Sequence, residues 1–214
     1  MNEVLPALGA GIISTLICNP LDTLRVNYQL NRKLYYDIGF LYRGINYGIL
    51  TIPTFWVIYF PMYKTLKKEV KSPMAAYISC CTASTITTPL WVLRQASQTN
   101  KKLDNSFKNL YRGLIPTYFI NLNFTIQIPL YEYIKTKLEN NTLNTFFAVA
   151  VSKTFASIMF YPFDTIRTRI RDGKYVLFSK KINYYKGISI YIARSLPYHV
   201  SIFCVYEYIK RFFP

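Results

Sequence analysis

The residues of this chain that are best suited to chemistry are charged side chains at a fixed offset from a proline. The motif occurs three times, as Pro20-Leu-Asp22-Thr-Leu-Arg25, Pro89-Leu-Trp91-Val-Leu-Arg94 and Pro162-Phe-Asp164-Thr-Ile-Arg167. Residues three apart share one face of a helix, so the acid and the base of a copy can form ion pairs there. The sequence shows no phosphate-binding loop, nucleophile arrangement or metal-ligand cluster. We therefore predict that the chain is not an enzyme and holds no metal and no cofactor.

These motifs belong to a longer pattern that repeats three times along the chain. The prolines are 69 and 73 residues apart, and each motif is followed by an aromatic-base-glycine triplet: Tyr42-Arg43-Gly44, Tyr111-Arg112-Gly113 and Tyr185-Lys186-Gly187. The second and third copies end on a shared pattern that holds Glu132, Lys135, Glu207 and Lys210, whereas the first has Lys67 and no acid. A fixed period indicates one supersecondary unit in several copies. We assign the copies to residues 1–69, 70–139 and 140–214 of a single domain, 1–214.

The elements that must position these residues follow from the hydropathy of the chain. Hydrophobic residues make up 51% of the 214 residues although the formal net charge is +16. This combination favours a membrane protein with basic loops and leaves a nucleic-acid-binding protein as the alternative class. Six apolar-rich stretches approach the ~20 residues of a membrane-spanning helix: roughly 4–24, 45–63, 74–93, 113–134, 143–163 and 187–209. We expect an all-α membrane protein with six transmembrane helices, kinked at Pro20, Pro89 and Pro162.

Three helix pairs around one axis would bring the three proline motifs together in a ring. Charges at that depth should point inward and pair, so the ring can close one end of a central cavity. The charged residues at the far ends of the even-numbered helices would form a second ring on the opposite side. Two gates on either side of a cavity between repeats are the physical basis of alternating access.

The proline motifs, the triplets and the Tyr-Glu-x-x-Lys endings together resemble the mitochondrial carrier family over essentially the whole chain. The resemblance implies a three-fold pseudosymmetric bundle of six helices that exchanges solutes across the mitochondrial inner membrane, or, as the alternative, across a peroxisomal or other organelle membrane. It implies a monomer in contact with membrane lipid such as cardiolipin, and no nucleic-acid partner. The richness in Asn, Lys, Ile and Tyr is typical of an AT-rich genome, such as that of a parasite, a protist or a large DNA virus.

The resemblance also assigns roles to the charged residues. The gate on the matrix side would pair Asp22 with Arg94 and Asp164 with Arg25. It would leave Trp91 to contact Arg167 through a cation–π interaction. The gate on the cytoplasmic side would consist of Glu132, Lys135, Glu207, Lys210 and Lys67. The interval before each triplet is shorter than is usual in the family, so we expect the short surface helix there to be reduced to a turn or lost.

The charges inside the apolar stretches indicate the cargo. All ten acidic residues lie outside the middle of these stretches, whereas Lys153 and Arg194 lie within them. A cavity with only positive charge attracts anions. Arg194 precedes Pro197 by three residues, an offset that the resemblance associates with substrate contact. A structural pair with a backbone carbonyl or with the gates is the alternative role for Arg194. The expected substrate-binding residues are Arg194, Phe119, Ile120, Thr51 and Lys153.

Trp91 in the second motif resembles the branch of the family that carries nucleotides and nucleotide-like cofactors. We therefore expect exchange of an anionic solute of that class. A carrier of carboxylates or inorganic phosphate would also suit a cationic cavity. A carrier-like scaffold that no longer transports is a third interpretation, because the first repeat lacks an acid at its end and the loops are short.

Overall fold

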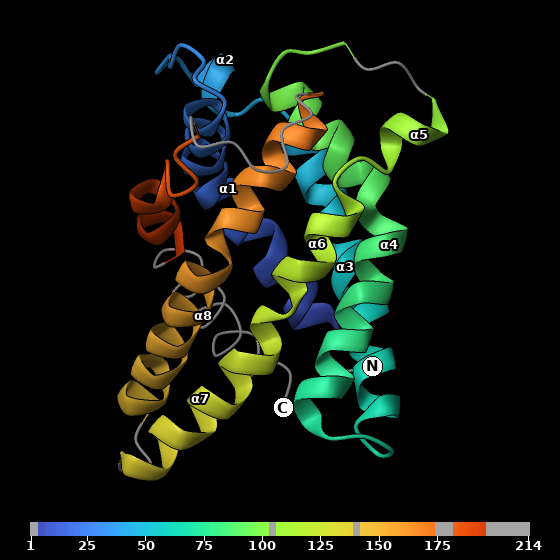
Figure 1. Cartoon of the computed structure of the whole chain (residues 1–214), viewed down its shortest axis with the longest axis vertical. Coiled ribbons are helices and arrows are strands. Elements are labelled where there is room, and N and C mark those ends of the chain that lie inside the picture. Colours follow the sequence, from blue (N-terminus) through green and yellow to red (C-terminus); the bar gives the residue numbers. More distant parts are fainter. Residues whose placement is uncertain (1–3, 103–105, 139–141, 174–181, 196–214) are drawn as a thin grey trace.

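The computed structural model describes residues 4–102, 106–138, 142–173 and 182–195, and within these ranges every regular element is a helix. The helices are α1 (Val4–Gln29), α2 (Ile38–Leu41), α3 (Ile45–Leu66), α4 (Ser72–Gln98), α5 (Phe107–Leu110), α6 (Leu114–Asn121), α7 (Asn123–Lys137) and α8 (Thr142–Arg171). Residues 188–195 are helical as well. The long helices extend along the longest axis of the molecule (Figure 1). The prediction of an all-α protein is confirmed for the described residues.

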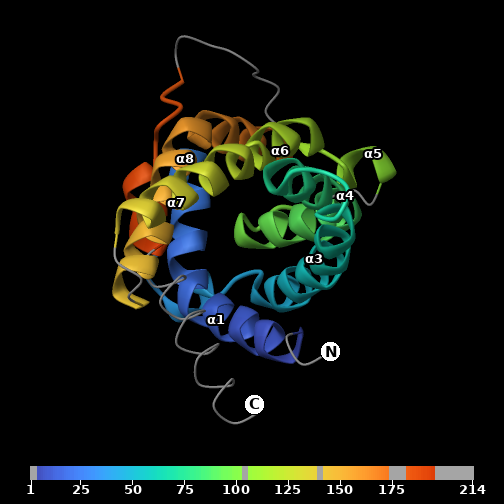
Figure 2. The same cartoon turned by 90° about the horizontal axis from the view of Figure 1, so that it is seen from below.

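The long helices form a closed ring around a central axis (Figure 2). α1 packs against α3, α3 against α4, and α4 against both α6 and α7. α6 and α7 in turn pack against α8, and α8 contacts α1. Each of the three proline motifs therefore lies on a different helix of the ring, on α1, α4 and α8.

The apolar-rich stretches of the sequence lie within helices, with one division. The stretch 113–134 is divided at Leu122 into α6 and α7. There the amide of Leu122 donates to the carbonyl of Phe119, three residues back, at 3.3 Å, which tightens the turn. The stretch 187–209 is described only as far as residue 195. When length and hydropathy are considered together, none of the helices in the described ranges is suited to crossing a membrane.

The three motif prolines lie inside helices without ending them. Pro20, Pro89 and Pro162 are internal residues of α1, α4 and α8. Each proline ring removes one backbone hydrogen bond from its helix, which is the physical reason to expect a kink. The kinks themselves stay a prediction.

Polar side chains face the interior of the ring and apolar ones face outward, which is the reverse of the usual pattern of burial. On α1, Asn19 is fully buried whereas Ile17 is 50% exposed. Buried polar residues of α4 and α8 include Ser79, Thr87, Thr88, Ser152 and Thr165, and exposed apolar residues of the same helices include Met74, Ile86, Phe147, Phe155 and Met159. Hydroxyl, amide and charged groups thus contribute much of the contact between helices, beside an apolar cluster of Tyr59, Cys80 and Ala83, and many exposed side chains are hydrocarbon.

In the first and second repeats, the interval between the proline-motif helix and the triplet contains a single helical turn. α2 and α5 have four residues each, as the short intervals led us to expect. Asp37 starts α2 as its N-cap and accepts a hydrogen bond from the amide of Phe40 at 2.9 Å. In the third repeat, residues 174–181 of the corresponding interval lie outside the described ranges.

The glycine of the first triplet allows close contact between neighbouring repeats. Gly44 has φ +74°, and a Cβ at this position would lie 2.8 Å from the carbonyl oxygen of Arg94 on α4. That separation is shorter than any ordinary carbon–oxygen contact, and the conformation favours glycine. The triplet therefore fixes the start of α3 directly against the proline motif of the second repeat.

Candidate functional site

Two ion pairs join the proline motifs of different repeats. Nη2 of Arg94 on α4 lies 3.1 Å from Oδ2 of Asp22 on α1. Nη1 of Arg25 on α1 lies 3.2 Å from Oδ2 of Asp164 on α8. All four side chains are buried. These are the two pairs that the family resemblance implied. Together with Arg167, which binds Asp164 on the same helix, these four residues are called the ion-pair network below: Asp22, Arg25, Arg94, Asp164 and Arg167.

Each aspartate of the network also binds the arginine three residues later on its own helix. Asp22 Oδ1 and Arg25 Nη2 are 3.2 Å apart, and Asp164 pairs with Arg167 in the same way. Both carboxylates therefore bind more than one guanidinium, so the charges are neutralised within a continuous network. Arg25 thereby connects α1 to α8 while Asp22 connects α1 to α4.

The expected contact between Trp91 and Arg167 does not form. The guanidinium of Arg94 lies over the indole of Trp91, 5.4 Å from the ring centroid, and Arg167 binds Asp164. A carboxylate on the same helix attracts a guanidinium more strongly than an indole face does, which explains the difference. α4 and α8 are instead joined by Gln95, whose Nε2 donates to the carbonyl of Thr168 at 2.6 Å.

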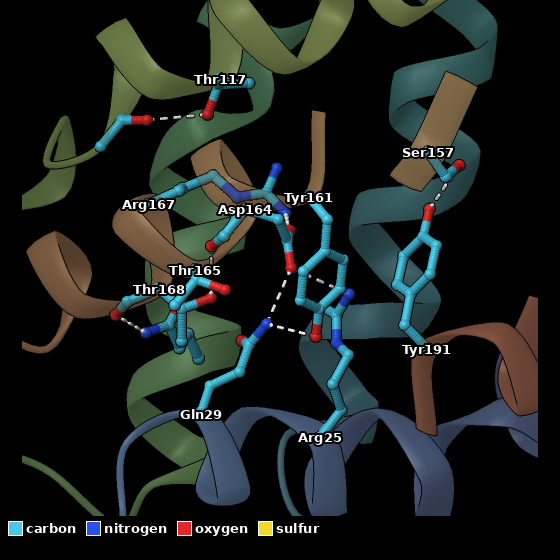
Figure 3. Close-up of polar contacts among 12 residues, drawn as sticks. Arg25, Gln29, Thr117, Ser157, Tyr161, Asp164, Thr165, Arg167, Thr168 and Tyr191 are labelled. Carbon is cyan, nitrogen blue, oxygen red and sulfur yellow. Dashed lines mark hydrogen bonds and ion pairs between the residues drawn. The ribbon is translucent and has the colours of Figure 1, made fainter. Parts of the chain in front are cut away.

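Neutral side chains extend the network in a way that the charge pattern did not reveal. Nε2 of Gln29 donates to Oδ2 of Asp164 at 3.1 Å and to the hydroxyl of Tyr161 at 2.9 Å. Figure 3 shows Arg25 and Gln29 of α1 directed at the same part of α8. Gln29 follows Arg25 by four residues, and this helical spacing is the signal that could have identified it.

The residue before the motif proline connects the network to the triplet of its own repeat. Asn19 accepts from Nη2 of Arg94 at 3.1 Å and donates to the carbonyl of Arg43 at 3.4 Å. Tyr161, at the same position of the third repeat, donates to the carbonyl of Lys186 at 3.0 Å. The second repeat has Thr88 there, which donates to Ser84 on its own helix. The sequence signal was a polar residue directly before each proline.

A cavity of about 280 Å³ adjoins the ion-pair network. It is lined by α1, α3, α4, α6, α7, α8 and the helical residues 188–195, so all three repeats contribute to its wall. The network residues form part of that wall, together with aromatic side chains that include Phe55, Trp56, Trp91 and Tyr191. The cavity wall therefore combines charged and aromatic side chains.

Three of the five predicted substrate-binding residues line this cavity: Ile120, Lys153 and Arg194. The other two do not. Thr51 is fully buried and donates to the carbonyl of Tyr47 at 2.5 Å. Phe119 is 45% exposed and stacks on Phe163 at 5.1 Å between ring centroids. Successive helical residues point about 100° apart, so Ile120 faces inward where Phe119 faces outward.

The two predicted cations of the cavity have different surroundings. Nε of Arg194 lies 3.6 Å from Oδ1 of Asp22, so Arg194 contacts the ion-pair network, which was its alternative role. Lys153 lies over the ring of Phe124, with Nζ 5.2 Å from the centroid. Lys153 forms no ion pair with any residue that the structure describes. Its ammonium group is therefore the cavity cation that is better placed to receive an anionic group of a ligand.

At the opposite end of the helices the charged residues are exposed and separate. Glu132, Lys135 and Lys67 are all exposed. The two lysines lie over tyrosine rings on their own helices, with centroid distances of 5.8 Å to Tyr63 and 5.9 Å to Tyr131. Glu132 has no ion pair within the described ranges, and Glu207 and Lys210 lie outside them. Among the described residues, ion pairs therefore join the repeats at the proline-motif end, and none is formed by Lys67, Glu132 or Lys135.

Comparison with curated proteins identifies relatives along almost the whole chain. The chain is 25% identical to mitochondrial substrate carrier family protein W of Dictyostelium discoideum, over 98% of this chain and 86% of the relative. It is 24% identical to the chloroplastic nicotinamide adenine dinucleotide transporter 1 of Arabidopsis thaliana, over 95% and 89%. It is 23% identical to a mitochondrial FAD carrier protein of Saccharomyces cerevisiae, over 98% and 96%. No family model matches the chain.

These relatives are named as transporters and carriers rather than as enzymes. The match to the FAD carrier protein extends over 298 positions, although the chain has 214 residues, so the chain is short for its relatives. The three motifs, the ring of helices and the near-complete coverage agree: the chain is similar to members of the mitochondrial carrier family.

Proposed function

We propose that this protein carries an anionic, nucleotide-like solute across the mitochondrial inner membrane by alternating access. The observation that supports this most directly is the cavity between the three repeats, whose wall includes the buried ion pairs. Lys153 also lines this cavity, and its ammonium group forms no ion pair with any described residue. In this proposal an anion enters the cavity from the side away from the ion pairs, and the ion pairs block its exit.

The outward-facing hydrocarbon supports a location in a membrane. Exposed apolar side chains occur on α1, α3, α4, α6 and α8, and the polar residues of α1, α4 and α8 are buried between helices. Polar groups that face lipid are costly, so a bundle in lipid should bury them between its helices. In this proposal the family's six helices span the membrane, both termini lie on the cytosolic side, and the protein works as a monomer in contact with lipid such as cardiolipin. The mitochondrial relatives point to the inner mitochondrial membrane.

In the proposed cycle the ion-pair network is the matrix gate. Opening toward the matrix separates α1 from α4 and α8, so it must break Asp22–Arg94 and Asp164–Arg25 together. Breaking a buried pair leaves uncompensated charge and is unfavourable by several kcal/mol. Binding of the solute in the cavity has to offset this. Closure of the outer gate would bring Glu132, Lys135, Glu207, Lys210 and Lys67 together.

The nucleotide-like cargo rests on Trp91 and on the relatives. By their names, the relatives include carriers of NAD and of FAD. Both solutes are dinucleotides that carry phosphate anions and aromatic bases. The cavity offers an ammonium group for the former and aromatic side chains for the latter.

The experiment is an uptake panel with the full-length protein reconstituted in liposomes. Labelled NAD, FAD, nucleoside phosphates, dicarboxylates, inorganic phosphate and amino acids are each supplied outside. We expect nucleotide-like solutes to enter faster than into empty liposomes. Uptake of amino acids without any nucleotide would overturn the proposal, uptake of carboxylates or phosphate alone would favour that alternative cargo, and absence of any flux would favour a scaffold.

A further inference from the structure

One polar side chain of the cavity has a hydrogen-bonding group without a partner. Asn123, the first residue of α7, lines the cavity and is 7% exposed. Its Oδ1 accepts no hydrogen bond from the residues that the structure describes. A buried amide oxygen without a donor costs about 1–3 kcal/mol, so this group calls for an explanation.

Asparagines on either side of the turn at Leu122 have different roles. Nδ2 of Asn121 donates to the hydroxyl of Ser84 at 3.0 Å and so joins α6 to α4. Asn123 is two residues further along, and the described part of the chain gives its oxygen no such structural partner. Its place in the cavity wall makes a ligand the natural partner.

The chemistry of Asn123 distinguishes between classes of ligand. A primary amide has an acceptor oxygen and a donor NH2 group side by side. Ionised carboxylates and phosphates are acceptors only, so they would leave the oxygen of Asn123 unsatisfied. A nucleobase edge presents a donor and an acceptor next to each other, and an asparagine amide can match both at once.

The surroundings of Asn123 provide the other two contacts that a nucleotide needs. Phe55 and Trp56 of α3 line the same cavity and offer aromatic faces for a base. Trp56 packs on Tyr59, with ring centroids 5.4 Å apart, and Tyr59 stacks on Phe124 at 6.2 Å. Lys153 lies over that same phenyl ring. Trp56 and Lys153 are thus connected through Tyr59 and Phe124, and Phe124 directly follows Asn123 in the chain.

We infer that Asn123 is a specificity-determining residue that recognises the hydrogen-bonding edge of a nucleobase. This inference rests on the proposed function and deepens it: the base lies between the aromatic side chains of α3 and the amide of Asn123, and a phosphate group lies at Lys153. Solutes that lack a base then bind through the cation alone.

The test compares two probes that differ only in the base, namely AMP and ribose 5-phosphate. Their affinities for the purified full-length protein in detergent are measured by calorimetry. In the wild type we expect AMP to bind more tightly. Asn123→Leu should weaken AMP binding about tenfold or more, because one polar edge of the base is left unmatched, and should leave ribose 5-phosphate within twofold of the wild type.

Gln127→Leu is the matched control. Gln127 lies one turn further along α7, its Oε1 is likewise buried without a partner in the described residues, and it does not line the cavity. We expect Gln127→Leu to bind both probes as the wild type does. An equal loss in both variants would contradict a specific role for Asn123.

The outcomes separate this inference from the proposed function. If Asn123→Leu binds AMP within twofold of the wild type, or if the wild type binds AMP no better than ribose 5-phosphate, the inference is wrong and an anion carrier remains. If the wild type binds neither probe, the proposed nucleotide cargo fails. If Asn123→Leu binds neither AMP nor ribose 5-phosphate while the wild type binds both, Asn123→Ser is measured as a second variant. The inference then requires that Asn123→Ser loses affinity for AMP and keeps its affinity for ribose 5-phosphate.

Discussion

At the scale of the residue, Asp164 is held by three side chains, from its own helix and from α1. It binds Arg25 of α1, Arg167 of its own helix and the amide of Gln29. Its side chain is 8% exposed, so these partners rather than water stabilise its charge. One carboxylate thereby joins two repeats, and its loss would affect both.

We predict that Asp164→Asn destabilises the protein by about 3–5 kcal/mol, because Arg25 and Arg167 both lose a carboxylate and the buried Arg25 shares Asp22 with Arg94. Thermal unfolding of the purified protein in detergent measures this effect. Glu69→Gln serves as the charge-matched control, since Glu69 is exposed. Equal unfolding temperatures of Asp164→Asn and the wild type would show that the pairs do not hold the repeats together.

Lys153 is the residue on which the charge preference of the cavity depends. We predict that Lys153→Gln lowers uptake of an anionic solute into liposomes about tenfold or more, because a charge-assisted hydrogen bond to the anion is lost. Lys68→Gln, a change at an exposed lysine, removes the same charge far from the cavity and should leave uptake as it is. Unchanged uptake by Lys153→Gln would place the anion site elsewhere.

At the scale of the element, the contact between neighbouring repeats depends on backbone geometry as well as on charge. The triplet of the first repeat ends on Gly44, whose left-handed conformation places it against the carbonyl of Arg94. Asn19 holds the carbonyl of Arg43 in the same triplet. The turn and the network are therefore positioned by the same few atoms.

We predict that Gly44→Ala lowers the unfolding temperature, because the new Cβ would lie 2.8 Å from a backbone oxygen in a conformation that strains an L-residue. Gly39→Ala is the control, since the nearest atom to its Cβ would be the flexible carboxylate of Asp37 at 3.3 Å. Thermal unfolding of both variants decides the matter. A larger loss in Gly39→Ala than in Gly44→Ala would be contrary to this account of the turn.

The repeated motifs made the helices and the main ion pairs predictable from the sequence. A ring of motifs follows from three copies of one unit around an axis, whereas the pairs Asp22–Arg94 and Asp164–Arg25 were implied by the resemblance to the mitochondrial carrier family. The roles of Gln29, Asn19 and Tyr161 did not follow, because neutral groups bond according to which atoms the packed backbone brings within reach. The sequence located the substrate contact on this helix only to within one residue, and successive helical residues point about 100° apart. It therefore could not decide whether Phe119 or Ile120 faces the cavity.

At the scale of the whole molecule, the ring of three repeats is asymmetric at Trp91. α1 is joined by ion pairs to both α4 and α8, whereas α4 and α8 meet through the hydrogen bond of Gln95. Trp91 lies beneath Arg94 instead of providing a third carboxylate. Between the motifs of the second and third repeats there is thus a neutral hydrogen bond where the other motif pairs have an ion pair.

We predict that Trp91→Asp stabilises the closed state, because a carboxylate at this position could pair with Arg167 and complete the ring. The unfolding temperature should rise and uptake into liposomes should slow. Trp91→Phe, which keeps an aromatic ring and adds no charge, separates the loss of the indole from the gain of the carboxylate. Faster uptake by Trp91→Asp would contradict the assignment of these residues to a gate.

The central claim is that this protein moves a nucleotide-like anion across a membrane through the cavity between its repeats. The most direct measurement is uptake of labelled NAD into liposomes that contain the full-length protein and are preloaded with unlabelled NAD. The account predicts saturable uptake above that of protein-free liposomes, reduced by excess unlabelled nucleotide outside and lost in Lys153→Gln. Uptake equal to that of protein-free liposomes, with amino acids entering at a higher rate, would contradict it.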